Sequence, residues 1–346
     1  MRGFESILDQ KQPIRILTTF LHKRAIPHAL LFTGIEGVGK RTTAIVFAMA
    51  CNCTGNITDK KEPNTEIPQQ QSPCGCCKTC RRIESENHPD VIFIKPVRGI
   101  IRIAQIRSLC QTLSLKPYEA KTRVVIISDA QAMNPESGNA LLKILEEPPA
   151  HTILILTATQ ATDLLLTVVS RCFHIRFQPI SRKSLENFLR KSDALSDEEA
   201  VIIASMASGS LSKALSMIKP ANLEYWINQR KWLIHDSGLD SPASLSSKPI
   251  GSLLAFAERL SKNKKNLPDL LEVMKTWLRD LIIWKFNPRL IINKDMTQKI
   301  QYASQQIDLD SLTSKIKTIE VAEKDIRANV NTRLALEVMF LRLVTN

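Results

Sequence analysis

Residues 34–41 read Gly34-Ile35-Glu36-Gly37-Val38-Gly39-Lys40-Arg41, and this stretch decides the fold. It matches the phosphate-binding pattern G-x-x-x-x-G-K-[ST] up to the lysine, but Arg41 stands where the pattern has Ser or Thr. In such a loop, backbone N–H groups and the lysine surround phosphate oxygens, and the following hydroxyl holds Mg²⁺. The sequence therefore predicts a nucleotide cradle that keeps its lysine and lacks one magnesium ligand.

The flanking residues support a true phosphate loop over the alternative, a glycine turn beside a surface lysine. Ala29–Thr33 is a short apolar run typical of a strand, and residues 42–49 are typical of a helix. A strand, a glycine turn and a helix N-terminus together aim N–H dipoles at phosphate. We expect ATP or ADP to contact residues that share this turn, namely Gly34, Gly37, Gly39, Lys40, Arg41 and Thr42.

A second strand is expected at Val124–Ile127, a continuous β-branched run typical of a buried parallel strand. In nucleotide hydrolases such a strand ends in an Asp that helps to hold Mg²⁺, often followed by a Glu that orients the attacking water. Here Ser128 and Asp129 take these places. Together with Arg41, this change predicts a site that does not hydrolyse nucleotide.

Four of the eight cysteines lie in Cys74-Gly75-Cys76-Cys77-Lys78-Thr79-Cys80. Cys74, Cys77 and Cys80 give the spacing C-x-x-C-x-x-C, which suits one tetrahedral Zn²⁺ that needs a fourth ligand. Cys53 is the expected fourth ligand, and Cys51 is the alternative. An all-cysteine site has no open position, so we expect the zinc to be structural. The alternatives are disulfides, against which a cytoplasmic setting argues, and unliganded thiols.

Composition bounds the class of protein. The chain has 346 residues, 44% hydrophobic and 23% charged, which is ordinary for a globular protein of two or three domains. Its net charge of +13 suits work near nucleic acid, although aromatic residues are only 5% and do not interleave with basic ones. No apolar run approaches the about 18 residues of a membrane span, and no signal-peptide pattern opens the chain. We expect a cytoplasmic protein without membrane association.

The remainder of the chain is predicted to be helical. Apolar spacing indicates three short helices at 184–189, 198–206 and 211–218. Beyond Pro220, amphipathic helices are expected at 224–235, 253–260, 267–286, 297–307, 309–323 and 327–344. Glu146 and Glu147, which precede two prolines, indicate the end of a helix at an interface more than a pair of catalytic carboxylates.

Specific motifs carry a family resemblance. Residues 139–149 read Asn-Ala-Leu-Leu-Lys-Ile-Leu-Glu-Glu-Pro-Pro, and Ser170-Arg171-Cys172 follows. With residues 28–32, the cysteine cluster and residues 329–337, they resemble the clamp-loader branch of the AAA+ family and, within it, the delta-prime subunits of bacterial DNA polymerase III. Specific motifs cover residues 1 to about 215.

The resemblance implies a three-part chain. Residues 1–178 would form an α/β AAA+ core with a parallel sheet, flanking helices and a zinc module at about 51–82. Residues 179–219 would form a small three-helix lid, and residues 220–346 an all-helical collar for oligomerisation. The implied partners are gamma/tau and delta subunits in a hetero-pentamer, with the beta sliding clamp and primer-template DNA met through the complex.

The resemblance also assigns roles to residues. Arg171 would be an arginine finger acting in trans on the ATP site of a neighbouring gamma/tau subunit, whereas without the family match a surface Arg at the start of a strand is the simpler interpretation. Motor subunits carry G-S-L-R in the lid, and the matching run here is Gly209-Ser210-Leu211-Ser212. This third departure favours delta-prime. The alternatives are an active gamma/tau-type motor and an unrelated ATP-dependent DNA repair or remodelling protein.

Overall fold

The computed structural model describes residues 3–55, 72–191, 195–218, 220–239, 249–263, 266–328 and 330–345. They form two compact units, one made of Met1–Leu185 with Gly209–Ser212 and the other of Glu186–Ser208 with Lys213–Asn346. The predicted zinc module falls partly on residues 56–71, which lie outside the described residues. The predicted domain boundaries at 178 and 219 stay a prediction.

The first unit is built on a parallel five-stranded sheet of the described residues with strand order β2-β3-β4-β1-β5. Its strands are β1 (Ala29–Thr33), β2 (Val91–Ile94), β3 (Arg123–Ile127), β4 (Thr152–Ala158) and β5 (Phe173–Arg176). All residues of β1, β3 and β4 are buried, which explains why the central residues of each strand form an apolar run without polar alternation. The predicted α/β core with a parallel sheet is confirmed.

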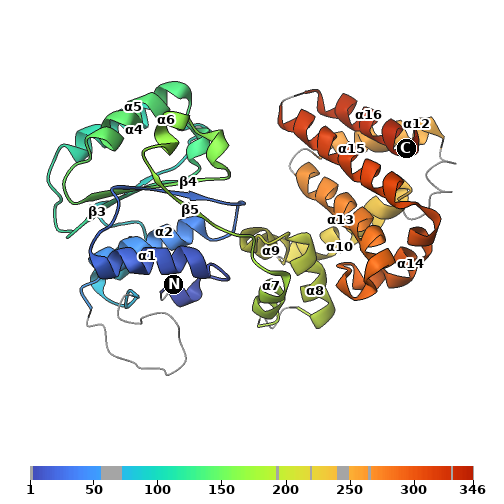
Figure 1. Cartoon of the computed structure of the whole chain (residues 1–346), viewed down its shortest axis with the longest axis horizontal. Coiled ribbons are helices and arrows are strands. Elements are labelled where there is room, and N and C mark those ends of the chain that lie inside the picture. Colours follow the sequence, from blue (N-terminus) through green and yellow to red (C-terminus); the bar gives the residue numbers. More distant parts are fainter. Residues whose placement is uncertain are drawn as a thin grey trace. The chain divides into compact units, whose positions relative to one another are not determined.

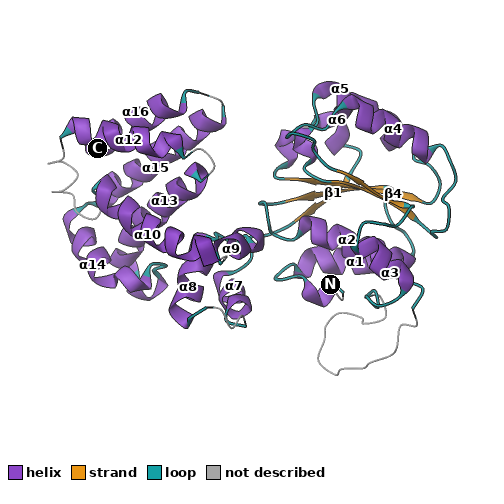
Figure 2. Ribbon diagram, turned by 180° about the vertical axis from the view of Figure 1, so that it is seen from behind, coloured by secondary structure: helices purple, strands orange, loops and turns teal. Residues whose placement is uncertain are grey.

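Helices cover both faces of this sheet (Figure 1). They are α1 (Lys11–Lys23), α2 (Lys40–Asn52), α3 (Lys78–Glu84), α4 (Ile103–Leu113), α5 (Pro135–Glu146) and α6 (Leu166–Val169). Helices α4, α5 and α6 lie on one face and α1 and α2 on the other, with α3 beside them (Figure 2). Because strand residues alternate between faces, Leu31, Val125 and Leu156 pack in the core beneath α4, α5 and α6.

The register of the sheet places the functional loops. Leu31 of β1 pairs with Leu156 of β4, and Val125 of β3 pairs with Leu154 of β4. Since the strands are parallel, their carboxyl ends lie at one edge, where open α/β sheets bind ligands. Residues 34–40 follow β1 at this edge, and Ser128 follows β3.

The second unit is helical in its described residues. Beyond α7 (Arg182–Leu189) and α9 (Leu211–Met217), which span the boundary between the units, its helices are α8 (Asp197–Met206), α10 (Pro220–Ser237), α12 (Ile250–Lys262), α13 (Leu267–Phe286), α14 (Thr297–Gln306), α15 (Leu309–Arg327) and α16 (Thr332–Thr345). Trp277 of α13 is completely buried, and its indole N–H donates to the Leu239 carbonyl at 2.9 Å. Phe256 and Phe340 meet edge to face, with ring centroids 5.2 Å apart, and join α12 to α16.

One helix boundary was predicted wrongly. The sequence indicated a last helix from Arg327, whereas α15 continues to Arg327 and α16 begins only at Thr332. Asn331 explains the break, because its side-chain oxygen accepts hydrogen bonds from the backbone N–H groups of Arg333 and Leu334. A capping side chain of this kind starts a helix at the next residue. Apolar periodicity alone did not reveal it.

Candidate functional site

The phosphate loop has the backbone conformation that its glycines predict. Gly34, Gly37 and Gly39 all have positive φ angles, of 146°, 76° and 103°. Gly37 is also tightly packed, because a Cβ atom there would lie 2.2 Å from the Ser210 hydroxyl oxygen. Its carbonyl oxygen accepts the backbone N–H of Leu211 at 3.0 Å. The loop therefore needs glycine for conformation and, at residue 37, also for contact with residues 210–212.

Lys40, the first residue of α2, is buried beneath the loop and only 8% exposed. Its Nζ donates to the carbonyl oxygen of Ile35 at 2.8 Å and also to that of Gly34. Burial lowers the pKa of Lys40 below its ordinary value, although the nearby Asp129 and Glu36 carboxylates offset part of this effect. A lysine at the N-terminus of a helix concentrates positive charge where phosphate would sit.

Arg41 replaces the expected magnesium ligand with an ion pair. Its guanidinium contacts Glu86, whose other carboxylate oxygen lies 2.6 Å from Lys95 Nζ. The guanidinium also lies over the Phe93 ring, 5.9 Å from its centroid. The hydrogen bond from Lys95 and the contact with Arg41 hold the pKa of Glu86 below its ordinary value. A positive side chain tied in this way cannot coordinate a cation.

The end of β3 also lacks the usual metal-directing carboxylate at position 128. Ser128 is 5% exposed, and its hydroxyl has no hydrogen-bond partner among the described residues. Asp129 is exposed, and its backbone adopts the left-handed conformation with φ of 52°. Its backbone N–H donates a hydrogen bond to the Thr157 hydroxyl. Proteins usually bind Mg²⁺ through one or two carboxylates, with near-octahedral geometry. Arg41 is a cation and does not fit a bound Mg²⁺, and the end of β3 has the neutral hydroxyl of Ser128 in place of the usual carboxylate.

Arg171 lies on the surface between α6 and β5. Its guanidinium Nη2 lies 2.8 Å from the Glu146 carboxylate, and its Nη1 donates to the Thr167 carbonyl at 2.9 Å. The side chains of Arg171 and Glu146 are 37% and 50% exposed. The structure thus confirms that α5 ends at Glu146, and it gives this carboxylate a partner that the sequence did not indicate.

Four cysteines converge at the end of α2 and the start of α3. The sulfur atoms of Cys53, Cys74, Cys77 and Cys80 all lie within 4.8 Å of one another. Cys53 and Cys74 are 3.5 Å apart, and Cys74 and Cys80 are 3.9 Å apart. Zinc with bonds of about 2.3 Å to tetrahedral thiolates would place sulfurs about 3.8 Å apart. The cluster could hold a metal ion of this kind.

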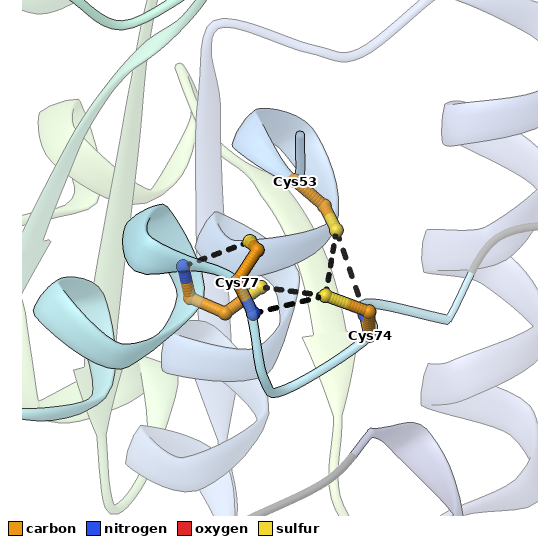
Figure 3. Close-up of side chains that lie close together, drawn as sticks. Cys53, Cys74 and Cys77 are labelled. Atoms are coloured by element: carbon orange, nitrogen blue, oxygen red, sulfur yellow. Dashed lines mark hydrogen bonds between the residues drawn. The ribbon is translucent and has the colours of Figure 1, made fainter. Parts of the chain in front are cut away.

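Backbone groups around the cluster favour the thiolate form (Figure 3). The N–H of Cys80 donates to Cys77 Sγ at 3.4 Å, and the N–H of Cys77 donates to Cys74 Sγ at 3.3 Å. Burial alone would raise the pKa of Cys77, but N–H groups of Cys80 and Thr54 lower it to about 5. Such N–H···S contacts are the outer partners that orient metal ligands.

The two other cysteines nearby stay outside the cluster. Cys51 lies within α2, and burial raises the pKa of its thiol to about 12. Cys76 is exposed. Of the two candidates for a fourth ligand, the structure therefore brings Cys53 to the cluster, because α2 ends at Asn52 and frees the next residue to turn toward the other thiols.

Two contacts that the sequence did not indicate complete the site. Glu86 and Glu146 each form an ion pair with an arginine named from its motif, and the sequence indicated neither pairing. No helix of the described residues is both long and apolar enough to cross a membrane.

Two protein families match separate parts of the chain, one N-terminal and one C-terminal. The family described as DNA polymerase III, delta subunit, matches residues 9–181, and the one described as DNA polymerase III, delta subunit, C terminal, matches residues 243–345. The delta' subunit of DNA polymerase III from Bacillus subtilis is 29% identical, covering 97% of this chain and 97% of that protein. The tau subunit of the same organism is 27% identical over 98% of this chain, which spans 61% of its length.

A solved structure of a DNA polymerase III gamma subunit-related protein from Thermotoga maritima aligns with 97% of this chain and 99% of its own, at 18% identity and a TM-score of 0.47. The two family matches together cover most of the sequence, and the first alone covers half of it. The chain therefore belongs to the DNA polymerase III delta subunit family.

Proposed function

We propose that this chain is the delta-prime subunit of a bacterial replicative clamp loader. It would assemble with gamma/tau and delta subunits in the cytoplasm and help to place the beta sliding clamp on primed DNA. The observation that carries the proposal is the ion pair between Arg41 and Glu86 at the magnesium position of the phosphate loop. A loop so altered, facing Ser128 in place of a carboxylate, suits a member of the ring that does not hydrolyse ATP.

Arg171 would be this chain's contribution to hydrolysis elsewhere in the complex. Its guanidinium is partly exposed and already oriented by two contacts. A guanidinium is always charged and matches phosphate geometry, which makes arginine suited to stabilise the charge that develops during phosphoryl transfer. In this role it would enter the ATP site of a neighbouring gamma/tau subunit.

The loop would keep a passive role toward nucleotide. Lys40 and the positive φ angles of the glycines preserve a cradle in which ATP or ADP could rest without turnover. The cysteine cluster would hold a structural Zn²⁺, with Cys53, Cys74, Cys77 and Cys80 as its four ligands.

An active motor subunit of the gamma/tau type is the second candidate. Its supporting observation is similarity, because the tau subunit of Bacillus subtilis and a gamma subunit of Buchnera aphidicola match 98% and 99% of this chain at 27% and 26% identity. Arg41 and Ser128 argue against it, since a motor needs both magnesium-organising positions. A DNA repair or remodelling ATPase would need the same ligands.

The test is ATP hydrolysis, by the purified chain and by the reconstituted loader with clamp and primed DNA. We expect no turnover by the chain alone and a large loss in the loader on Arg171→Ala, of about a thousandfold or more at the dependent site. Turnover by the isolated chain that disappears with Lys40→Ala would replace this proposal with the motor assignment.

A further inference from the structure

The guanidinium of Arg171 is held from two directions by two different helices. Glu146, the last residue of α5, lies 2.8 Å from Nη2, and the Thr167 carbonyl of α6 accepts from Nη1 at 2.9 Å. A guanidinium carries five N–H donors in one plane. Two contacts fix that plane and leave three donors for another acceptor.

Helix α6, which supplies the Thr167 carbonyl, is itself packed firmly against the core. Val168 of α6 is 1% exposed and packs in the core beneath α4 and α5. Leu165, just before α6, lies so close to α5 that a Cβ atom on Gly138 would be 2.7 Å from its Cδ1 atom. The backbone of Arg171, which follows α6, is therefore positioned without the Glu146 contact.

Stability does not explain the contact between Arg171 and Glu146. Both side chains are more than a third exposed, and exposed ion pairs contribute little to folding because water screens them. Orientation is a better explanation. Arginine loses much rotamer freedom when it binds, and a side chain held in place beforehand loses less at the moment of reaction.

We propose that Glu146 is a positioning residue for Arg171, whose carboxylate holds the guanidinium in the orientation that meets the phosphate of a nucleotide on a neighbouring subunit. This inference rests on the proposed function, in which Arg171 acts in trans. The next residue, Glu147, provides a matched control, because its carboxylate is exposed and forms no ion pair with the residues that the structure describes.

The experiment uses the reconstituted loader and measures ATP hydrolysis across a range of ATP concentrations. Glu146→Ala should lower kcat about fivefold and leave KM within about twofold, because it disturbs orientation and not ATP binding. Glu146→Gln should recover part of the loss, since its amide oxygen can still accept from Nη2. Glu147→Ala should change neither constant.

A double variant separates a positioning role from any other. In an Arg171→Ala background, Glu146→Ala should cause no further loss, because the side chain that it positions is already gone. A further loss there, or equal behaviour of Glu146→Ala and Glu147→Ala in the wild-type background, would overturn the inference while Arg171 kept its role. If Arg171→Ala itself changed nothing, the trans-acting role and the positioning role would fall together.

Discussion

The side chain of Arg41, near the start of α2, forms an ion pair with Glu86, two residues beyond the end of α3. At the other end of the same two helices, Cys53 follows α2 and meets Cys77 and Cys80 at the start of α3. Helices α2 and α3 therefore run in opposite directions and are joined at both ends. The altered phosphate loop and the cysteine cluster are parts of one helix pair.

The ion pair predicts how nucleotide binding responds to magnesium. In the wild type, the affinity for ADP should change by less than about twofold between Mg²⁺ and EDTA, because Arg41 is a cation held by Glu86 and Ser128 offers no carboxylate to the ion. In the double variant Arg41→Thr with Ser128→Asp, Mg²⁺ should tighten binding by about tenfold or more. Titration calorimetry gives both values. A tenfold increase in the ADP affinity of the wild type on adding Mg²⁺ would contradict the interpretation that this loop has lost its magnesium site.

The cysteine cluster predicts the metal content of the chain. Mass spectrometry under native conditions should find about one zinc ion per wild-type chain and none after Cys74→Ser. Cys76→Ser is the matched control, because Cys76 is exposed and lies outside the cluster, so it should keep its zinc. A chelator should lower the melting temperature of the wild type and leave that of Cys74→Ser unchanged. Equal zinc content in all three proteins would exclude this site.

Asp90 predicts a pH dependence of stability. It is 2% exposed, and its carboxylate accepts the N–H groups of Tyr118, Glu119 and Ala120 at 2.8–2.9 Å. Burial alone would raise the pKa of Asp90, but these N–H groups and Arg123 hold it below its ordinary value. Asp90→Asn should reduce the free energy of unfolding by about 2–4 kcal/mol at neutral pH, since the amide nitrogen would face donors.

The sign of the pH effect follows from the lowered pKa. The charged form is favoured in the folded chain, so the stabilisation is complete above the unfolded pKa of about 3.9 and is lost as pH falls through the folded value. The stability difference between the wild type and Asp90→Asn should therefore shrink below about pH 4. Urea unfolding at several pH values measures it. A difference that stays constant down to pH 3 would show that the charge is unimportant.

Alanine substitutions at Gly37 and Gly99 distinguish the cost of backbone strain from the cost of a steric clash. Both have positive φ, of 76° and 82°, but a Cβ atom on Gly99 would meet nothing within 4 Å, whereas one on Gly37 would meet residues 210 and 212. Gly99→Ala should cost about 1 kcal/mol of unfolding free energy, the cost of a left-handed alanine. Gly37→Ala should cost about 1–3 kcal/mol more, because Ser210 must move. Equal melting temperatures would show that the contact with residues 210–212 is easily displaced.

Much of the first unit could be predicted from the sequence because its elements have strong local patterns. The strands β1, β3 and β4 each contain an apolar run of four residues, and such a run is typical of a strand buried on both faces in a parallel sheet. The phosphate loop was equally clear, since its glycines are required by backbone geometry. Cys53 could not be separated from Cys51 until the end of α2 was known.

The contacts of the two arginines could not be predicted, because each depends on tertiary structure. Arg41 and Glu86 are 45 residues apart, and they meet only because α3 returns alongside α2. Glu146 was expected to end a helix, but its contact with Arg171 depends on how α6 packs against α5. The break before Thr332 was missed for a different reason, because the start of α16 depends on hydrogen bonds to the single side chain of Asn331 and apolar spacing does not report such a cap.

The place of β1 in the sheet has a consequence for how the chain is made. This strand is synthesised first, yet both of its neighbours, β4 and β5, come from much later in the sequence. At about 5–20 residues per second, a ribosome leaves β1 unpaired for roughly ten seconds. The cysteines of residues 53–80 emerge early in that interval and can fasten α2 to α3 before any neighbouring strand exists. If the cluster holds Zn²⁺ as proposed, zinc shortage should therefore appear first as aggregation of newly made chains, before it affects proteins that have already folded.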